Sequence, residues 1–228
     1  MYPLLLFPAF VLLIVVLVKQ PALRFLSHQL GKPSGWFGRV IISRALKSGN
    51  MPGARWLISS ISKMHKFNNV LEFGFGPGDS IALLLQHCNS YTGIEISKTM
   101  FEMAVELNRE VIEQKKAKLF LNENLSSLGL EKIGTQKFDL VYHFNVIYFW
   151  KDPLTKLKEI KTVLKENGLH CICIKTEPPV RKDGFIARNA PGLMNKESII
   201  RALNDAGYKK IDVIENDQLH TICIAARS

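Results

Sequence analysis

The feature that most constrains the fold is an apolar run that ends in closely spaced glycines. Residues 69–73 are mostly apolar and predict a buried β-strand, and an apolar helical stretch begins at Ile81. The glycines between them are Gly74, Gly76 and Gly78. A strand, a glycine-rich loop and a helix in this order let backbone amides approach a ligand closely. Asp79 occupies the third glycine position of the dinucleotide fingerprint G-x-G-x-x-G, where its carboxylate would repel a pyrophosphate. The loop therefore predicts a ligand other than a dinucleotide.

The pattern around this loop resembles a known motif. Residues 70–78 read apolar, apolar, Glu, apolar, Gly-x-Gly-x-Gly, which is similar to the first motif of class I S-adenosylmethionine-dependent methyltransferases. Glu95 ends a second apolar run and matches the acidic residue that holds the ribose in that family. The resemblance extends from about Leu30 to the C-terminus. It is nearest to the small-molecule branch that contains the ubiquinone and menaquinone methyltransferases (methyltransferase type 11).

The resemblance implies the fold, the cofactor and a set of cofactor-binding residues. The fold would be α/β, a Rossmann-like doubly wound sheet of seven strands, mostly parallel with the last strand antiparallel. The cofactor would be S-adenosyl-L-methionine. The cofactor-binding residues would be Glu72, Gly74, Gly76, Gly78, Glu95, Ile96, Glu123, Asn124 and Asn145. Glu123 or Asn124 would lie near the adenine, although the Gly-Asp pair usual there is absent.

The predicted fourth strand, residues 138–144, is the next-best match to the family. Asn145 and Tyr148 follow it, at the edge where open parallel sheets bind ligands. Their spacing is similar to the Asn-Pro-Pro-Tyr of amino-group methyltransferases, but Val146 and Ile147 replace both prolines, which argues against a DNA or glutamine-amide methylase.

Tyr148 and its neighbour His143 are the candidate catalytic bases for an acceptor that must lose a proton. A core histidine on a strand is the competing interpretation of His143. In the segment before the first strand, Trp36, Met51 and Trp56 are candidate pocket residues, and packing of their helices onto the sheet is the competing interpretation of each.

Capping residues predict several boundaries. Ser97 and Asp152 are good N-caps, Pro153 suits the first helical position, and Gly168 would end the helix that Asp152 begins. A fifth strand, a final helix and a strand pair are expected at residues 169–175, 195–207, 211–214 and 220–225. Residues 177–192 contain three prolines and predict a loop over the site.

The N-terminal part differs from the rest in charge. Residues 1–71 contain nine Lys and Arg residues and no Asp or Glu, whereas the remainder has 21 basic and 20 acidic residues. Residues 2–18 are uncharged and mostly aliphatic. At about 1.5 Å per residue, such a helix would span roughly 25 Å, the low end of what crosses a bilayer core.

We therefore expect three parts: a membrane anchor at residues 1–20, a helical lid and substrate-pocket segment at 21–68, and the methyltransferase domain at 69–228. Basic residues after a single-pass anchor predict that the domain stays on the cytosolic side. A cleaved signal peptide, an organelle-targeting segment and a hydrophobic hairpin are the competing interpretations of the first part.

The remaining composition predicts no metal site and no nucleic-acid partner. None of the cysteine spacings is typical of zinc, so reduced thiols are expected at Cys88, Cys171, Cys173 and Cys223. Beyond residue 71 the charges balance, which leaves no excess for binding phosphates.

The predicted function is methyl transfer to a small, apolar or lipid-like acceptor at a membrane surface. The alternatives are a non-catalytic scaffold that keeps the cofactor and a nucleic-acid methylase. The acceptor atom and the oligomeric state stay open.

Overall fold

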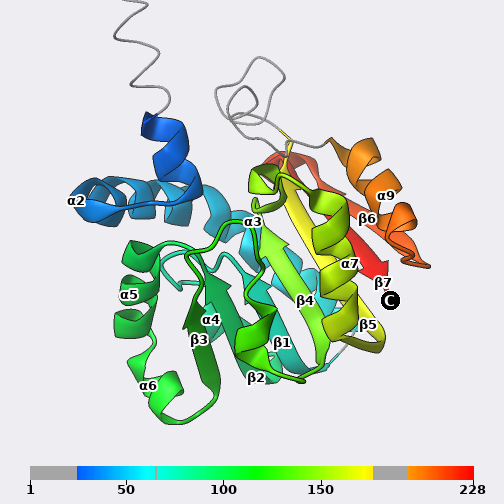
Figure 1. The fold of residues 1–228 in the computed structure, drawn as a ribbon, viewed down its shortest axis with the longest axis horizontal. Coiled ribbons are helices and arrows are strands. Elements are labelled where there is room, and N and C mark those ends of the chain that lie inside the picture. Colours follow the sequence, from blue (N-terminus) through cyan, green and yellow to red (C-terminus); the bar gives the residue numbers. More distant parts are fainter. Residues whose placement is uncertain (1–24, 65, 177–194) are drawn as a thin grey trace, which may run out of the picture.

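The computed structural model describes residues 25–64, 66–176 and 195–228. Its strands are β1 (Phe67–Phe73), β2 (Cys88–Glu95), β3 (Ala117–Leu121), β4 (Phe138–Phe144), β5 (Leu164–Lys175), β6 (Ile211–Asn216) and β7 (Thr221–Arg227). They form one sheet in the order β3-β2-β1-β4-β5-β7-β6 (Figure 1). Strands β1 to β5 pair in parallel, and β7 runs antiparallel to β5 and β6. The predicted seven-stranded, mostly parallel sheet with an antiparallel last strand is confirmed.

The strand order reverses between β1 and β4. From β1 the chain adds β2 and β3 on one side and then crosses to β4 on the other side. The carboxyl ends of β1 and β4 therefore flank a crevice of the kind that binds ligands in doubly wound sheets.

Helices cover both faces of the sheet. They are α4 (Ile81–Leu84), α5 (Lys98–Leu107), α6 (Arg109–Glu113), α7 (Pro153–Val163) and α9 (Lys196–Asp205), with short turns η2 (Leu130–Ile133), η3 (Ile147–Phe149) and η4 (Asp217–Leu219). On one face, α7 and α9 pack through residues such as Leu157 and Leu203. On the other, α4 and α5 pack through Ile81 and Ala104. Both faces of the central strands are thus buried, which explains their nearly continuous apolar sequence.

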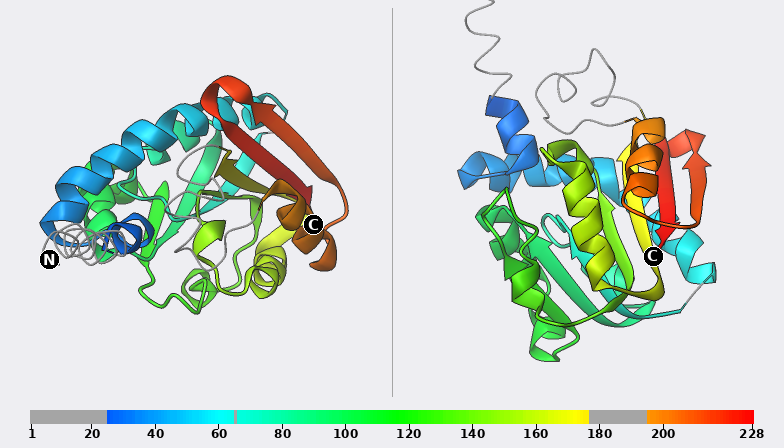
Figure 2. Two further views of the ribbon diagram at one scale, coloured as in Figure 1. Left: turned by 90° about the horizontal axis from the view of Figure 1, so that it is seen from above. Right: turned by 45° about the vertical axis from the view of Figure 1, so that its right-hand side comes forward.

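Residues 35–64, before β1, form one helical rod. It comprises α2 (Gly35–Phe37), a π-helical turn η1 (Gly38–Ile42) and α3 (Ser43–Met64), and Figure 2 shows them as a continuous helix along one side of the domain. Gly53 lets α3 approach the end of β4, because a Cβ atom there would lie 2.7 Å from the ring of Phe144. Leu57 and Ile58, which follow, are buried against the sheet.

The predicted helix starts are confirmed, and one predicted helix end is wrong. Ser97 accepts the Met100 N–H at 3.1 Å and Asp152 accepts the Thr155 N–H at 3.1 Å, as N-caps do. The helix α7 does not end at Gly168. It ends at Val163, and β5 begins at once because Leu164 already pairs with Phe138 of β4.

Two predictions lie outside the described residues. The anchor at residues 1–20 falls within residues 1–24, and the loop at residues 177–192 falls within residues 177–194. In residues 25–64, 66–176 and 195–228, no helix is both long and apolar enough to cross a bilayer. The four cysteines are free thiols, and three of them are buried.

Candidate active site

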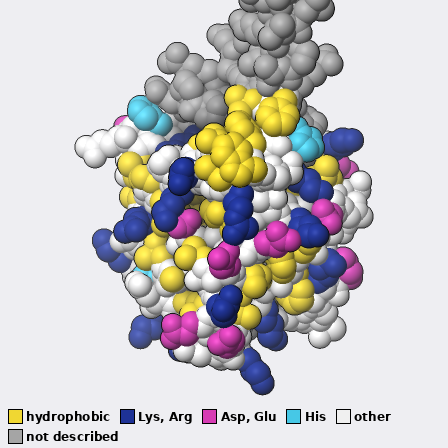
Figure 3. Space-filling model, turned by 90° about the vertical axis from the view of Figure 1, so that its left-hand side faces the viewer, with side chains coloured by type: hydrophobic (Ala, Val, Ile, Leu, Met, Phe, Trp, Pro, Cys, Tyr) yellow, Lys and Arg dark blue, Asp and Glu magenta, His cyan; other side chains and the backbone are white. Residues whose placement is uncertain are grey.

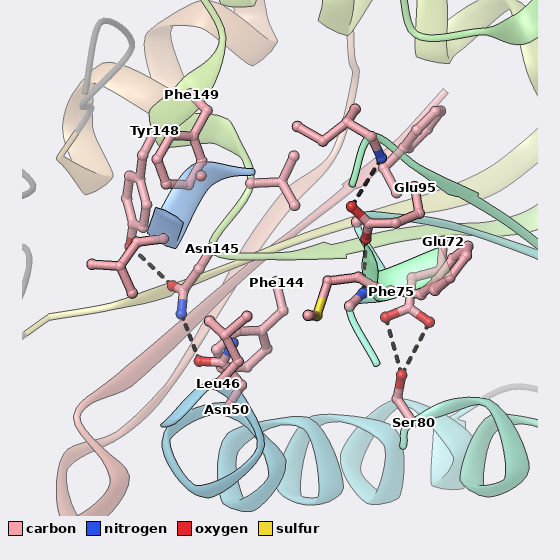
Figure 4. Close-up of a pocket in the computed structure, with 18 of the residues that line it drawn as sticks. Leu46, Asn50, Glu72, Phe75, Ser80, Glu95, Phe144, Asn145, Tyr148 and Phe149 are labelled. Atoms are coloured by element: carbon pink, nitrogen blue, oxygen red, sulfur yellow. Dashed lines mark hydrogen bonds between the residues drawn. The ribbon is translucent and has the colours of Figure 1, made fainter. Parts of the chain in front are cut away.

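A cavity of about 680 Å³ opens at the carboxyl ends of the central strands. The glycine loop and the end of β2 line one side of it, and the ends of β4 and β5 line the other. Figure 4 shows members of these two residue groups facing each other across the cavity, Glu72 and Glu95 from the first and Asn145 and Tyr148 from the second, with Phe144 between them. We call the first group the loop end, which consists of Glu72, Gly76, Glu95 and Ile96. We call the second group the β5 end, which consists of Asn145, Tyr148, Lys175 and His220.

The glycine loop exposes its backbone to the cavity at Gly76. Gly76 has a φ of +57° and nothing within 4 Å of the position a Cβ atom would take, so its open side faces free space. Gly78 does not line the cavity. A Cβ atom there would lie 2.7 Å from the Cβ of Ala104 in α5, so Gly78 serves the packing of the loop on that helix. The Phe75 ring packs on Gly93 of β2, where a Cβ would lie 2.5 Å from it.

Glu95 lies at the end of β2 with its carboxylate held by backbone amides. It accepts the N–H groups of Gly76 at 2.8 Å and of Ile96 and Ser97 at 2.9 Å each. Burial raises the pKa of Glu95, and the three N–H donors oppose that rise. The carboxylate thereby ties the glycine loop to β2 and keeps Oε2, which accepts only one of these three bonds, toward the loop (Figure 4).

Glu72 is the second buried carboxyl group at the loop end. Tyr91 donates a hydrogen bond to it at 2.7 Å, and Ser80 lies 3.2 Å from both of its oxygens. Burial raises its pKa to about 7, against the effect of these donors, and the nearby Glu95 adds to the rise. Glu72 therefore changes charge near neutral pH.

The end of β3 differs from the prediction. Glu123 does not line the cavity; its side chain is exposed and pairs with Lys32 at 3.6 Å. Asn124 also lies outside the cavity lining. Asn122 and Leu128 lie there instead, because the Asn122 N–H donates to the Glu95 carbonyl at 2.8 Å and the loop then folds back over the cavity. The sequence does contain a signal for Asn122, because it is the polar residue that directly follows the strand.

Asn145 is the centre of a hydrogen-bond network at the β5 end. Its side chain donates to Asn50 of α3 at 3.0 Å and accepts from the Tyr148 hydroxyl at 3.2 Å and the Lys175 N–H at 3.1 Å. It adopts a left-handed conformation with a φ of +57°, which asparagine tolerates better than most residues. Burial raises the pKa of Tyr148, so this hydroxyl stays protonated and acts as a donor rather than a base.

The structure places His143 away from the cavity, which corrects its assignment as a catalytic candidate. On β4 its side chain points to the α7 side, where its ring lies 4.9 Å from the Trp150 ring and 5.3 Å from the His170 ring. Neither ring nitrogen has a hydrogen-bond partner in the described part of the chain, and burial lowers its pKa to about 3. His143 is therefore a neutral core histidine. It lies on the covered face because side chains alternate between the two faces along a strand.

The cavity also contains residues that the sequence patterns did not indicate. Lys175 ends β5, and its Nζ donates to the Leu219 carbonyl at 2.7 Å; burial lowers its pKa. His220 follows Leu219 and lines the same end. They come together because β7 runs antiparallel beside β5, a pairing that local sequence does not reveal.

Of the three candidate pocket residues, Met51 lines the cavity, whereas Trp36 is exposed and Trp56 packs against the core. Asp79 also lines the cavity and forms an ion pair of 2.5 Å with Lys47 of α3. Among the described residues, no group of three or more His, Cys, Asp and Glu side chains is placed to hold a metal ion.

The strand order, the open glycine loop and the carboxylate at the end of β2 agree with the arrangement that the resemblance to class I methyltransferases implies. A family profile described as a methyltransferase domain matches residues 71–172, which span the loop, Glu95 and most of β5. Over the residues that the profile covers, the match supports the predicted recognition of a class I S-adenosylmethionine-dependent methyltransferase. The profile does not specifically support the ubiquinone branch.

Solved structures give the same fold at low sequence identity. An O-methyltransferase family protein from Burkholderia thailandensis is 14% identical with a TM-score of 0.65, covering 83% of this chain and 59% of that one. The CurJ carbon methyltransferase is 15% identical with a TM-score of 0.67, covering 88% and 60%. The N-methyltransferase NodS from Bradyrhizobium japonicum is 15% identical with a TM-score of 0.58, covering 78% and 96%.

The chain thus spans about 60% of the length of the first two structures. These three proteins are named for transfer to oxygen, carbon and nitrogen, so the shared fold does not identify the acceptor atom. A search of curated protein sequences gave no match.

Proposed function

We propose that this protein transfers the methyl group of S-adenosyl-L-methionine to a small, apolar or lipid-like acceptor at a membrane surface. The observation that carries the proposal is a single cavity with two unlike ends. A buried carboxylate beside an open glycine loop forms one end, and an apolar chamber with a few polar groups forms the other. A volume of about 680 Å³ is within the range of small-molecule sites.

The loop end fits the cofactor. The Glu95 carboxylate would accept the ribose hydroxyls, since Oε2 receives one backbone bond and keeps room for another. Gly76 would admit the cofactor to the loop backbone, and Ile96, Asn122 and Leu128 would surround the adenine. The cofactor supplies a methyl group already activated by a sulfonium, so the protein chiefly has to orient the acceptor and exclude water.

The β5 end fits an apolar acceptor. Its walls near the network of Asn145 are mostly carbon, from Leu46, Met51, Phe144, Val146, Phe149 and Leu219. An apolar acceptor would gain roughly 25 cal/mol for each Å² of carbon surface that it buries there. The network that joins Asn50, Asn145 and Tyr148 would orient the polar group of the acceptor through the Tyr148 hydroxyl.

The acid-base group of the proposed reaction is His220. Among the described histidines, it is the one that lines the cavity. Its imidazole is the cavity-lining group that would take the proton from an acceptor that must lose one. Lys175 beside it would favour an acceptor that carries a partial or full negative charge.

The membrane part of the proposal rests on the N-terminal sequence. Residues 2–18 are uncharged and mostly aliphatic, and residues 19–71 carry basic charge only. Apolar acceptors concentrate in bilayers, so an enzyme held there by such a segment would meet them at high local concentration.

The proposal is tested by transfer of label. Full-length protein is incubated with S-adenosylmethionine labelled in its methyl group and a membrane extract, and mass spectrometry identifies the labelled product. The matched control is Glu95→Gln, which keeps the size of the side chain and removes its charge. We expect a labelled product of lipid solubility with the wild type and little with the variant. Binding of the cofactor without any label transfer would favour the non-catalytic scaffold.

A further inference from the structure

Large apolar side chains stand exposed on the N-terminal helical segment. The exposed fraction is 51% for Phe25, 36% for Leu26, 71% for Trp36 and 43% for Ile41. We call these four residues the apolar patch. Two pieces of chain form it, since the Phe25 ring lies 5.4 Å from the ring of Phe37 in α2. Exposed apolar groups that cluster in this way mark interaction surfaces in soluble domains.

The π-helical turn helps to assemble the patch. Trp36 of α2 and Ile41 of η1 are five residues apart, and the wider π-helical turn brings residues with this spacing closer to one side of the helix than an α-helix would. Figure 3 looks onto this end of the molecule and shows a group of hydrophobic side chains near the top of the domain, with Lys and Arg side chains beside it.

The charged side chains of the chain segment that carries the apolar patch are all positively charged. Residues 25–66 contain seven Lys and Arg residues and no Asp or Glu. Lys32 and Arg39 flank Trp36 in the sequence and reach exposed partners, Glu123 at 3.6 Å and Glu106 at 2.8 Å. Exposed ion pairs of this kind are weak, so both cations can exchange these partners for an anionic surface.

We propose that the apolar patch rests on an anionic lipid bilayer and forms a membrane contact made by the folded domain itself. A lipid surface is the occupant that three observations favour together. Only six residues, of which Lys19 and Arg24 are basic, separate Phe25 from the uncharged aliphatic run of residues 2–18. The cations beside the patch match anionic headgroups. Tryptophan, the most exposed member, is the residue typical of the membrane interface.

This inference deepens the proposed function by giving the acceptor a route. Leu30, Gly31 and Pro33 lie between the two pieces of the patch and line the cavity. Gly31 packs so closely on Phe149 that a Cβ atom would lie 2.9 Å from its ring. The patch therefore borders the cavity, and with the patch on the bilayer an apolar acceptor enters from the lipid instead of crossing water.

The test uses tryptophan fluorescence of the full-length protein bound to vesicles of phosphatidylcholine and phosphatidylserine. Part of the phosphatidylcholine carries bromine on its acyl chains, which quenches a tryptophan that contacts them. The variant Trp36→Phe removes the reporter, and the matched control Trp56→Phe removes a half-buried tryptophan of α3 that is outside the patch. We expect the bromine-sensitive part of the emission to disappear in Trp36→Phe and to persist in Trp56→Phe.

A second variant measures the energetic part of the contact. The double substitution Trp36→Asp and Ile41→Asp changes exposed side chains, so it leaves the fold intact, and it is expected to lower vesicle partitioning at least about tenfold. Phosphatidylserine should strengthen binding of the wild type, and salt should weaken it.

Three outcomes would overturn the inference. Vesicle binding with equal bromine quenching in the wild type and Trp36→Phe would leave residues 1–24 as the whole contact. Trp36 emission that is already shielded without vesicles would mean that this N-terminal part covers the patch. Concentration-dependent dimerisation that the double substitution abolishes would assign the patch to a second copy of the chain. None of these measurements depends on methyl transfer, so a failure here is distinct from a failure of the proposed reaction.

Discussion

The loop end and the β5 end of the cavity hold their polar groups by different means. At the loop end, Glu95 is fixed by three backbone N–H groups that belong to two neighbouring stretches of chain. At the β5 end, Asn145 is fixed by side chains and backbone from α3, η3 and β5. A site fixed by backbone binds one common ligand well, whereas a site fixed by side chains can change its specificity through single substitutions. The two ends thus suit a constant cofactor and a variable acceptor.

The largest effect is expected from Glu95→Ala, which removes the central group of the loop end. Two charge-assisted hydrogen bonds to the ribose are worth roughly 4 kcal/mol together, so affinity for S-adenosylmethionine should fall about a thousandfold. Isothermal titration calorimetry measures the affinity, and thermal unfolding shows whether the domain stays folded. The control is Glu123→Ala, an exposed carboxylate that sequence patterns also suggested and that should change nothing. Equal affinity in the wild type and Glu95→Ala would remove the loop end as the cofactor site.

The next effect is expected from His220→Gln at the β5 end. A general base contributes about 100-fold or more to a rate, so kcat should fall by about that factor for an acceptor that loses a proton, with the KM for the cofactor unchanged. The control is His87→Gln, an exposed histidine outside the cavity. If both variants kept the wild-type kcat, the β5 end would act by positioning alone.

The same contrast explains what the sequence could predict. The loop end is local: Glu72, the glycines and Glu95 lie within one strand-loop-helix-strand unit, and both the sheet and these residues follow from apolar runs, glycines and a family motif. The β5 end depends on distant pairing, since Lys175 and His220 meet only because β7 lies beside β5.

Errors arose where local patterns compete with packing. Gly168 looked like a helix end but lies within a strand, and His143 occupies a strand position whose face is set by the fold rather than by its neighbours in sequence. At the end of β3, a one-residue shift placed Asn122 in the cavity instead of Glu123.

A third prediction tests whether His143 belongs to the β5 end at all. Its pKa is about 3 in the folded protein against 6.5 when unfolded, so the unfolded chain binds the extra proton as the pH falls below 6.5. The stability that neutral His143 contributes is present above that pH and is lost toward pH 3; between pH 7 and pH 5 the loss is about 2 kcal/mol.

The variant His143→Phe keeps a ring against Trp150 and cannot take up a proton. Its free energy of unfolding, measured in urea, should therefore gain about 2 kcal/mol relative to the wild type when the pH is lowered from 7 to 5, while methyl transfer is unchanged. Comparing the wild type with His143→Phe at each pH cancels the contribution that other titrating groups, such as His170, make to the free energy of unfolding. A large loss of kcat at constant stability would instead restore His143 to the reaction.

The smallest effect is a pH dependence of the affinity for S-adenosylmethionine that we expect from Glu72. It tests whether the charge of the loop end alone senses the cofactor. With a pKa of about 7, Glu72 is mostly protonated below neutral pH and mostly ionised above it. A cationic sulfonium favours the ionised form, so affinity for S-adenosylmethionine should rise roughly tenfold from pH 6 to pH 8. S-adenosylhomocysteine has no charge on its sulfur and should show a smaller rise.

Other ionisable side chains also line the cavity: the ion pair of Lys47 and Asp79, and Lys156, Lys175 and His220. The control that isolates Glu72 is Glu72→Gln, which can still accept the hydrogen bond from Tyr91 and should abolish the difference between the two ligands. If the difference persisted in Glu72→Gln, the charge that senses the sulfonium would lie elsewhere, and His220 at the β5 end would be the group to vary next. The two ends would then be coupled through charge, and the cofactor site could no longer be treated as independent of the acceptor site.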